Sequence, residues 1–545
     1  MDDYFHGAGG DGCVYTTNAC YVPLCWEFNN SYFPEWFIGD VCSDDALKGG
    51  EGVASAMSYV YYLENFKGVA ENDMLLDMYR ANYQGIGRCN LAIQQIPTVE
   101  PDTVMDARLQ ERLLGECYFL RAYYYFRLVR IFGGVPISTQ VLDGENSKLD
   151  RATADQVYDQ IISDLTEAEA RLWSRRDPSF TTSDWGRATK GAAQAMLQKV
   201  YLYRHDYANS LAWGDKVIQS GDYNLVDNYA SNFTLEGENN DESVFEIQYG
   251  EENSSDYGGV NAHVGATRGT FTTVLTRGRQ YGGWGWNHPT QCLFDEFEEG
   301  DARREATILD PLSIYMCPNK IGDAPCGWSY RGYNPPAVCG RCGQAADWKH
   351  PVETRDYYLG ICYYNAKTGL YSADGTTVAR ELAHDTRGEL NKKEIRYADV
   401  LLMHAEAAAE LGQTTVAEND LETVRARARA WIIANDTTGL DPNDVLPAYP
   451  NYTFKENGIG SPISAGSDLK KAIRHERRVE LAMESHRWFD LCRWGSAEQV
   501  MNAYRDAESS EVRGEMGVFN PSVHYLFPIP PKEIELNPMS QNPGY

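Results

Sequence analysis

The sequence predicts a mainly α-helical fold in which helices from both ends of the chain surround a long irregular middle region. Helical apolar spacing recurs within residues 107–219 and 392–494, whereas residues 221–390 are rich in Gly, Asn, Tyr and Trp and lack a sustained helical period. Hydrophobic residues make up 43% of the chain and aromatic residues 12%. This composition supports a large buried core and excludes global disorder.

The first predicted helices precede the middle region. Residues 107–132 carry apolar side chains nearly all round, so we expect a largely buried helix that ends at Gly133-Gly134. Residues 155–172 place their apolar side chains on one stripe, as expected for a helix with one buried face. A further helix is expected at 77–82.

Residues 187–204 and 207–219 predict two antiparallel helices joined by a short turn. Small residues at Gly191, Ala192 and Ala195 would let a neighbouring helix approach closely. Such a pair resembles a tetratricopeptide unit of about 34 residues, so we expect a tetratricopeptide-like helical scaffold.

Helical spacing returns after the middle region, where we predict helices at 392–411, 415–433 and 467–494. Within the middle region only Ser243–Tyr249 alternates like a strand. A loop stretch of this length is usually functional, so we expect the irregular region to carry a binding surface.

The net charge of −29 and the pI near 4.8 limit the partners of this protein. Phosphate backbones and anionic membrane surfaces would repel such a chain, which argues against nucleic-acid binding and favours neutral or cationic ligands. No apolar run of about 18 residues is present, so we expect no membrane-spanning helix. The N-terminus lacks the features of a signal peptide, which leaves a cytoplasmic protein or a mature form as alternatives.

Glu476, Glu480 and Glu484 form an i, i+4 ladder, and Arg477 and Arg487 each lie three residues from one of these glutamates. Paired carboxylates could act as a catalytic acid and base. Adjacent arginines lower carboxylate pKa values instead of raising one of the pair, so we favour a structural network. No metalloprotease, nucleophile-elbow, Walker or EF-hand motif is present.

Thirteen cysteines occur, and one group has a spacing that suggests a site: Cys317, Cys326, Cys339 and Cys342. Two disulfides, a zinc site or free thiols are all compatible with this spacing. The C-x₂-C half matches a zinc ligand pair, whereas the other half is longer than in common zinc ribbons. Beyond this group, which could hold two disulfides or a structural zinc ion, we expect no metal site and no cofactor.

Aromatic residues crowd the middle region in Gly-rich segments, where they could stack on sugar rings. About half of them should prove to be packing, because tryptophan is buried on average. The tight GGWGW segment could itself be structural. These aromatic residues are Tyr281, Trp284, Trp286, Trp328, Tyr330, Tyr333, Trp348, Tyr357 and Tyr358.

Four ordered blocks together resemble the SusD/RagB family. Residues 115–136 contain GECYFLRA and FGGVP, residues 395–407 read IRYADVLLMHAEA, residues 475–495 contain HERRVEL and RWFDL before RWG, and residues 528–545 contain PIP and end in QNPGY. The resemblance runs from about residue 36 to the end of the chain.

The resemblance implies a SusD-like fold with a tetratricopeptide-like scaffold and an irregular ligand-binding region. It implies one domain over 1–545, with scaffold at 75–220 and 392–545 and a ligand-binding region at about 221–391 plus 40–74. It further implies a lipid-anchored protein on the outer face of the outer membrane, which captures oligosaccharide for a SusC-like TonB-dependent transporter. No chemistry on the ligand is implied.

Ligand sites in the family lie near an early Trp- and Asn-containing stretch and in the middle region. By their location in these stretches and by their side-chain chemistry, and not by matched motif residues, we expect ligand contacts from Asn72, Asp73, Tyr281, Trp284, Trp286, Trp328, Tyr330 and Trp348. A peptide-binding RagB-like receptor is the alternative. A glycoside hydrolase ranks behind both, because it needs two carboxyl groups about 5–9 Å apart, one with a raised pKa.

Overall fold

Most of the described chain is helical. The computed structural model describes residues 2–26, 35–50, 58–144, 146–250, 269–277, 283–309, 364–368, 388–435, 442–508, 513 and 516–545. The long helices are α1 (Asp2–Tyr21), α4 (Asp73–Gln95), α5 (Ala107–Phe132), α6 (Ala154–Arg171), α7 (Lys190–Tyr203), α8 (Tyr207–Ser220), α13 (Tyr397–Glu410), α14 (Thr414–Asn435), α16 (Leu469–Leu481) and α18 (Ala497–Ala507).

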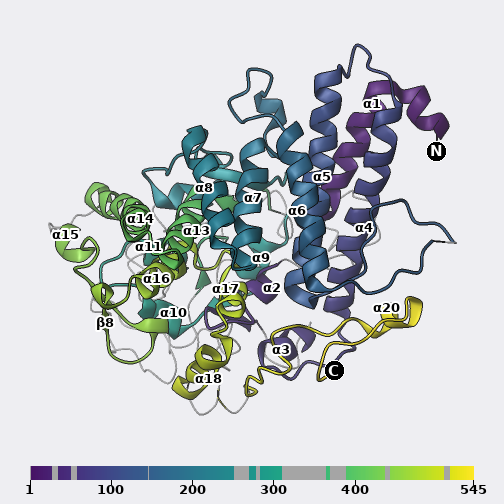
Figure 1. The fold of residues 1–545 in the computed structure, drawn as a ribbon. Coiled ribbons are helices and arrows are strands. Elements are labelled where there is room, and N and C mark those ends of the chain that lie inside the picture. Colours follow the sequence, from purple (N-terminus) through teal and green to yellow (C-terminus); the bar gives the residue numbers. More distant parts are fainter. Residues whose placement is uncertain are drawn as a thin grey trace.

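These helices form one continuous scaffold (Figure 1). Each of α4, α5, α6 and α7 packs on the next helix in the chain, and α8 then packs on α13, which contacts α14 and α16. Helices α8 and α13 are neighbours in space although the whole middle region separates them in the sequence. The mainly helical fold, with one scaffold built from both ends of the chain, is therefore confirmed.

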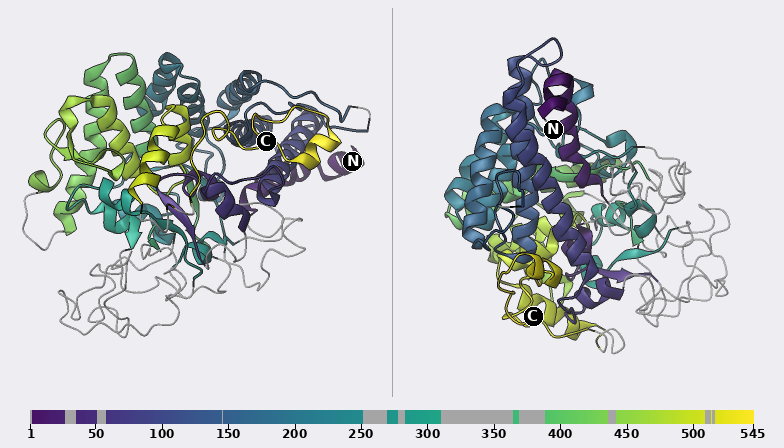
Figure 2. Two further views of the ribbon diagram at one scale, coloured as in Figure 1. Left: turned by 90° about the horizontal axis from the view of Figure 1, so that it is seen from below. Right: turned by 90° about the vertical axis from the view of Figure 1, so that its right-hand side faces the viewer.

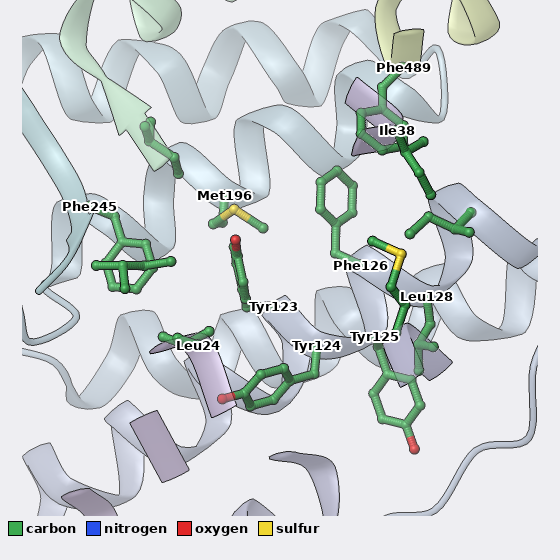
Figure 3. Packing of buried hydrophobic residues seen from close by; sticks show 14 of the residues in the cluster. Leu24, Ile38, Tyr123, Tyr124, Tyr125, Phe126, Leu128, Met196, Phe245 and Phe489 are labelled. Carbon is green, nitrogen blue, oxygen red and sulfur yellow. The ribbon is translucent and has the colours of Figure 1, made fainter. Parts of the chain in front are cut away.

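Helix α5 lies at the centre of the core. The Asp106 side chain caps it by accepting a hydrogen bond from the Leu109 amide at 2.7 Å, and Gly133 ends it with φ of 71°. Figure 3 shows its aromatic residues Tyr123 and Phe126 among buried side chains from other elements. Burial of each large apolar side chain contributes about 1.5–3 kcal/mol, so the all-round apolar character of α5 anchors the scaffold.

Helix α1 was not predicted from the sequence. Its glycine-rich first half contains Gly9 at φ of 56°, which interrupts the helical geometry. Its second half packs on α4 and α5 through Cys13, Thr17 and Cys20, which are all fully buried. These residues have helical i, i+4, i+7 spacing, and the stripe becomes visible only when cysteine is counted as a small hydrophobic residue.

Two predicted helices differ from the structure. Residues 392–396 are not helical but form strand β6 (Lys392–Arg396), which pairs antiparallel with β2 (Ser243–Ile247). Lys393 of β6 forms an ion pair with Glu246 of β2 at 2.7 Å. Pairing with a distant strand overrides the local helix preference, so α13 begins only at Tyr397.

The predicted helix 467–494 is two helices, α16 and α17 (Arg487–Arg493). The chain breaks between them at Met483 and Ser485, whose φ angles are 62° and 70°. The Ser485 amide donates a hydrogen bond to Oδ1 of buried Asp40 at 2.8 Å. This contact with a distant segment stabilises a turn that the local sequence pattern does not indicate. The predicted helix at 77–82 likewise begins earlier, at Asp73.

Short two-stranded sheets attach the irregular segments to the scaffold. Strand β1 (Ala46–Gly49) pairs with β3 (Trp286–Pro289), and β4 (Ile308–Leu309) pairs with β5 (Tyr364–Asn365). The β1–β3 pair joins the early stretch to the middle region, and in the left view of Figure 2 the purple strand β1 lies below the long helices, next to teal segments of the middle region. Near the C-terminal helices, β7 (Thr453–Phe454) pairs with β8 (Ile463–Ser464). Within the described segments, no helix is both long and apolar enough to span a bilayer.

Candidate functional site

A buried network of ion pairs supports the candidate site. Glu480 of α16 accepts hydrogen bonds from Arg303 and Arg396, both at 3.0 Å, and from Arg427 at 2.5 Å. All four side chains are at most 7% exposed. Burial alone raises the pKa of Glu480, but Arg427 and Arg396 outweigh it and hold that pKa at about 2. Glu480 is therefore a structural anion and not a proton donor.

The structure confirms a network here but corrects its partners. Arg477 binds Asp399 at 2.6 Å and Asp490 at 2.7 Å, and Arg487 binds Asp44 at 2.7 Å. The sequence suggested pairing within one helix. The break after α16 and the burial of this helix instead turn its charged side chains toward other elements, which supply the counter-charges.

A narrow cleft lies above this network, and we call it the central cleft. It has a volume of about 70 Å³, which accommodates a few ligand atoms and not a whole sugar ring. The ranges 251–268 and 369–387 lie outside the described residues. Described residues close to both ranges line the cleft. Its lining residues are Trp36, Asn232, Phe233, Tyr249, Thr270, Thr272, Thr273, Asn287, Lys367, Thr368, Leu390, Asn391, Lys392, Lys393, Met483, Glu484 and Ser485.

One wall of the central cleft is built around Trp36. This side chain is 4% exposed, lies in α2 (Trp36–Gly39) and donates from its indole nitrogen to Thr272 Oγ1 at 3.2 Å. Asn287 on the neighbouring strand β3 donates to Asp40 at 3.2 Å, while its own Oδ1 atom is buried and has no hydrogen-bond partner among the residues that the structure describes. An unsatisfied buried acceptor costs free energy, so Asn287 Oδ1 can accept a hydrogen bond from a ligand or a water molecule.

The floor of the central cleft combines charge pairs with a strained turn. Glu484 accepts from Arg396 at 2.7 Å and from Lys367 at 2.6 Å. Burial lowers the pKa of Lys367 to about 8, although Glu484 opposes this effect. Met483 and Ser485 flank Glu484 in the left-handed region, at a cost of about 1–3 kcal/mol each. Strain of this kind persists where the surroundings fix the backbone, and it concentrates at functional sites.

The described part of the central cleft lacks the acid–base pair of a glycoside hydrolase. Among the described residues that line the cleft, Glu484 is the sole carboxylate. Burial raises the pKa of Glu484, but Arg396 and Lys367 outweigh burial and lower it. Burial raises the pKa of Asp40 to about 7, but this side chain is 0% exposed and is held by Asn287 and the Ser485 amide. The geometry described here is suited to binding.

Two predicted contacts, Trp284 and Trp286, lie next to each other beside the cleft. Their ring centroids are 5.9 Å apart, and Trp286 also packs on Phe37 at 6.0 Å. Trp286 is 3% exposed and lies beneath the Lys48 ammonium group, whereas Trp284 is half-buried. Trp286 therefore has a packing role, as the tight glycine-rich segment suggested.

Asn72 and Asp73 lie on a different element, at the start of α4. Asn72 is 4% exposed and caps this helix by accepting from the Leu75 amide at 3.2 Å, and its Nδ2 group donates to the Tyr59 carbonyl. Asn72 thus serves as a helix cap. Asp73 is exposed in the first turn, where a carboxylate is favourable to the helix dipole.

The other predicted contacts lie outside the described residues: Tyr281, Trp328, Tyr330 and Trp348. The cysteine group is also outside them: Cys317, Cys326, Cys339 and Cys342. Among the described cysteines, Cys89 and Cys117 are buried free thiols. No group of three or more potential metal ligands occurs within the described segments. Sequence reasoning did not single out Trp36 or Asn287 as contacts, because only the pairing of β1 with β3 brings their segments together.

The comparison with protein families decides what this architecture is. The model of the SusD family matches residues 241–545, and a model described as starch-binding associating with outer membrane matches residues 50–202. The chain belongs to the SusD family. The predicted family membership is thereby confirmed.

Known SusD-like proteins match nearly the whole chain. Two from Formosa agariphila are 25% and 27% identical over 87% and 89% of this chain, and over 80% and 83% of their own lengths. A solved laminarin-binding SusD-like protein has 27% identity and a TM-score of 0.72, with 98% of this chain and 99% of that chain covered. A surface glycan-binding protein A from Bacteroides thetaiotaomicron, in complex with laminarihexaose, shares the fold with a TM-score of 0.69 at 20% identity.

Proposed function

We propose that this protein is a cell-surface receptor that binds oligosaccharide and delivers it to a SusC-like TonB-dependent transporter. The observation that carries the proposal is the near-complete match to a SusD-like protein that binds laminarin. The acidic character of the chain agrees with a neutral ligand. We further propose that the receptor acts on its ligand by binding alone, since the carboxylate in the described part of the central cleft is paired with cations.

Affinity electrophoresis against a panel of polysaccharides tests this proposal. We expect retardation of the protein in gels that contain laminarin or another neutral glucan. Retardation by no member of the panel, together with binding to peptides, would instead support a peptide-binding RagB-like receptor. Incubation of the bound glycan with the protein should return it unshortened, and shorter products would indicate a glycoside hydrolase.

The predicted contacts in the middle region allow a residue-level test. Replacing Trp328 and Trp348 by Ala should weaken glycan binding at least about tenfold without a change in thermal stability, because each substitution removes an indole on which a sugar ring would stack. The control is Trp213→Ala on α8, a half-buried residue whose ring lies 3.5 Å from Lys216 Nζ. Equal affinity of the double variant and the wild type would place the binding surface elsewhere.

The transporter and the lipid anchor are proposed from family membership, and the outer membrane appears in the description of the matching starch-binding model. Affinity purification from membranes of the native bacterium tests both. We expect a large β-barrel transporter in the purified complex and an acyl group on the receptor. Recovery of the receptor alone and without acylation would contradict this part of the proposal.

A further inference from the structure

A second hollow lies beside the turn that precedes α7. It borders the central cleft at the end of β2, where Gln248 lines the hollow and the next residue, Tyr249, lines the cleft. The hollow has a volume of about 260 Å³. Residues of α1, of the adjoining turn η1 (Val22–Cys25), of the 183–187 turn and of strand β2 with the residue after it line the hollow, among them Asn18, Leu24, Ser183, Trp185, Phe245 and Gln248. We call it the Trp185 groove. It is larger than the central cleft and approaches the volume of about 300 Å³ at which small-molecule sites begin.

The indole of Trp185 is unusual within this protein. It is 48% exposed, while Trp26, Trp36, Trp286 and Trp488 are each at most 4% exposed. It is the sole tryptophan among the large exposed hydrophobic side chains of the described segments. An exposed indole leaves apolar surface in water and gains no core packing, and at the mouth of a groove it offers a flat face on which a ligand can stack.

The structure fixes the backbone on both sides of Trp185. The preceding turn, η3 (Thr182–Asp184), is closed by reciprocal hydrogen bonds of Thr181 with Asp184, and Asp184 also pairs with Arg112 at 2.8 Å. The following residue, Gly186, has φ of 86°, and a Cβ atom there would lie 2.1 Å from Gln248 Cγ. Close packing of Gly186 on Gln248 therefore presents the indole on a preorganised turn, which reduces the entropy cost of binding.

The two charged side chains that line the groove, Arg187 and Glu246, are paired with opposite charges, and Glu246 binds Lys393 at 2.7 Å. Arg187 donates to Glu116 and to Asn18 Oδ1, both at 2.9 Å, so its charge is compensated. Within the described residues, the Asn18 amide nitrogen, the Ser183 hydroxyl and the Trp185 indole nitrogen have no hydrogen-bond partner. A flat aromatic face beside neutral donors and a hydroxyl matches a sugar ring, whose C–H face stacks while its hydroxyl groups form hydrogen bonds.

We infer that the Trp185 groove is a second carbohydrate-binding subsite, which binds one sugar unit of a neutral polysaccharide. This inference rests on the proposed function and adds a second point of attachment for the same polymer. Two attachment points on one chain raise the apparent affinity for a long glycan through effective concentration. Short oligosaccharides that reach only one site gain no such advantage.

The test compares Trp185→Ala and Trp185→Phe with the wild type. The probes are the polysaccharide bound most tightly in the panel and a hexasaccharide prepared from it. For Trp185→Ala we expect the affinity for the polysaccharide to fall about tenfold or more, since the second attachment point is lost. The number of hexasaccharides bound per protein molecule should fall from two to one. Trp185→Phe should retain most of the polysaccharide affinity because it keeps a stacking ring. Trp213→Ala removes a tryptophan outside the groove and is the control, and its glycan affinity and stoichiometry should equal those of the wild type.

The outcomes separate this inference from the proposed function. A wild-type protein that binds no member of the panel would overturn both. A wild-type protein that binds glycan, with the same affinity and stoichiometry in Trp185→Ala, would overturn the subsite alone. Equal melting temperatures of the variants and the wild type establish that lost binding does not reflect unfolding, and we expect them because Trp185 contributes little to the core.

Discussion

His475 of α16 lies between two carboxylates and on an aromatic ring. Its Nδ1 atom is 2.7 Å from Glu296 and its Nε2 atom is 3.3 Å from Glu298, and the imidazole stacks on Phe454 at 4.2 Å. Burial alone lowers the pKa of His475, but the hydrogen bonds to Glu296 and Glu298 outweigh it and raise the pKa to about 9. The folded protein therefore holds a histidinium ion at neutral pH.

Because the folded pKa of His475 lies above the unfolded value near 6.5, its contribution to stability is fully present below pH of about 6.5 and is lost as the pH rises through about 9. We predict that His475→Gln flattens the fall in unfolding free energy between pH 6 and pH 9.5. Chemical denaturation at several pH values measures this. Parallel curves for the variant and the wild type would show that His475 is neutral in the folded state.

At the scale of the element, helix α16 depends on counter-charges from other segments. Glu480 binds three arginines, each from a different part of the chain, and removal of one buried partner leaves uncompensated charge. We predict that Glu480→Gln lowers the unfolding free energy by about 3–5 kcal/mol at pH 7. The exposed pair Lys471–Glu456 provides the control, since Lys471→Met should cost less than about 1 kcal/mol.

The same variant has a signature at acidic pH. The folded pKa of Glu480 is about 2, below the value near 4.5 in the unfolded chain, so its stabilisation is present above pH of about 4.5 and is lost as the pH falls toward 2. The difference between the wild type and Glu480→Gln should shrink over this range. A constant difference down to the acid unfolding limit would contradict the role of Glu480 as the anion of the network.

Helix α2 reaches the strained turn through a glycine. A Cβ atom on Gly39 would lie 2.3 Å from the Ser485 carbonyl oxygen and 2.5 Å from its Cα atom. We predict that Gly39→Ala lowers the unfolding free energy by about 1–3 kcal/mol or more. The reason is that neither the backbone at Gly39 nor the backbone at Ser485 can move without disturbing the central cleft. Gly87→Ala on α4 is the control: nothing lies within 4 Å of its Cβ position, and alanine should add about 0.5–1 kcal/mol. Equal stability of the two alanine variants would refute the contact.

At the scale of the whole molecule, local sequence patterns were sufficient for the scaffold. Helix α5 spans Ala107–Phe132, as the apolar spacing and the terminal glycines predicted, because its burial on all sides leaves a continuous signal. The patterns failed where a distant partner decides the local structure. Strand β6 depends on β2, and the break at Ser485 depends on Asp40.

The candidate site was harder to predict for the same reason. Asn72 has the residue type of a ligand contact, but its position at a helix start makes it a cap. Trp286 has the type of a stacking residue, but strand pairing buries it. The exposed Trp185 lies in a short turn whose local sequence gives no indication of exposure, so only the folded structure distinguishes it from the packed tryptophans.

We propose that the whole molecule is a glycan receptor without hydrolytic activity. Calorimetric titration of the purified protein with laminarin, followed by size analysis of the recovered glycan, tests it most directly. We expect saturable heat of binding and recovery of the glycan at its original length. Absence of binding to laminarin and to the other glycans of the panel, or recovery of shortened chains, would contradict it.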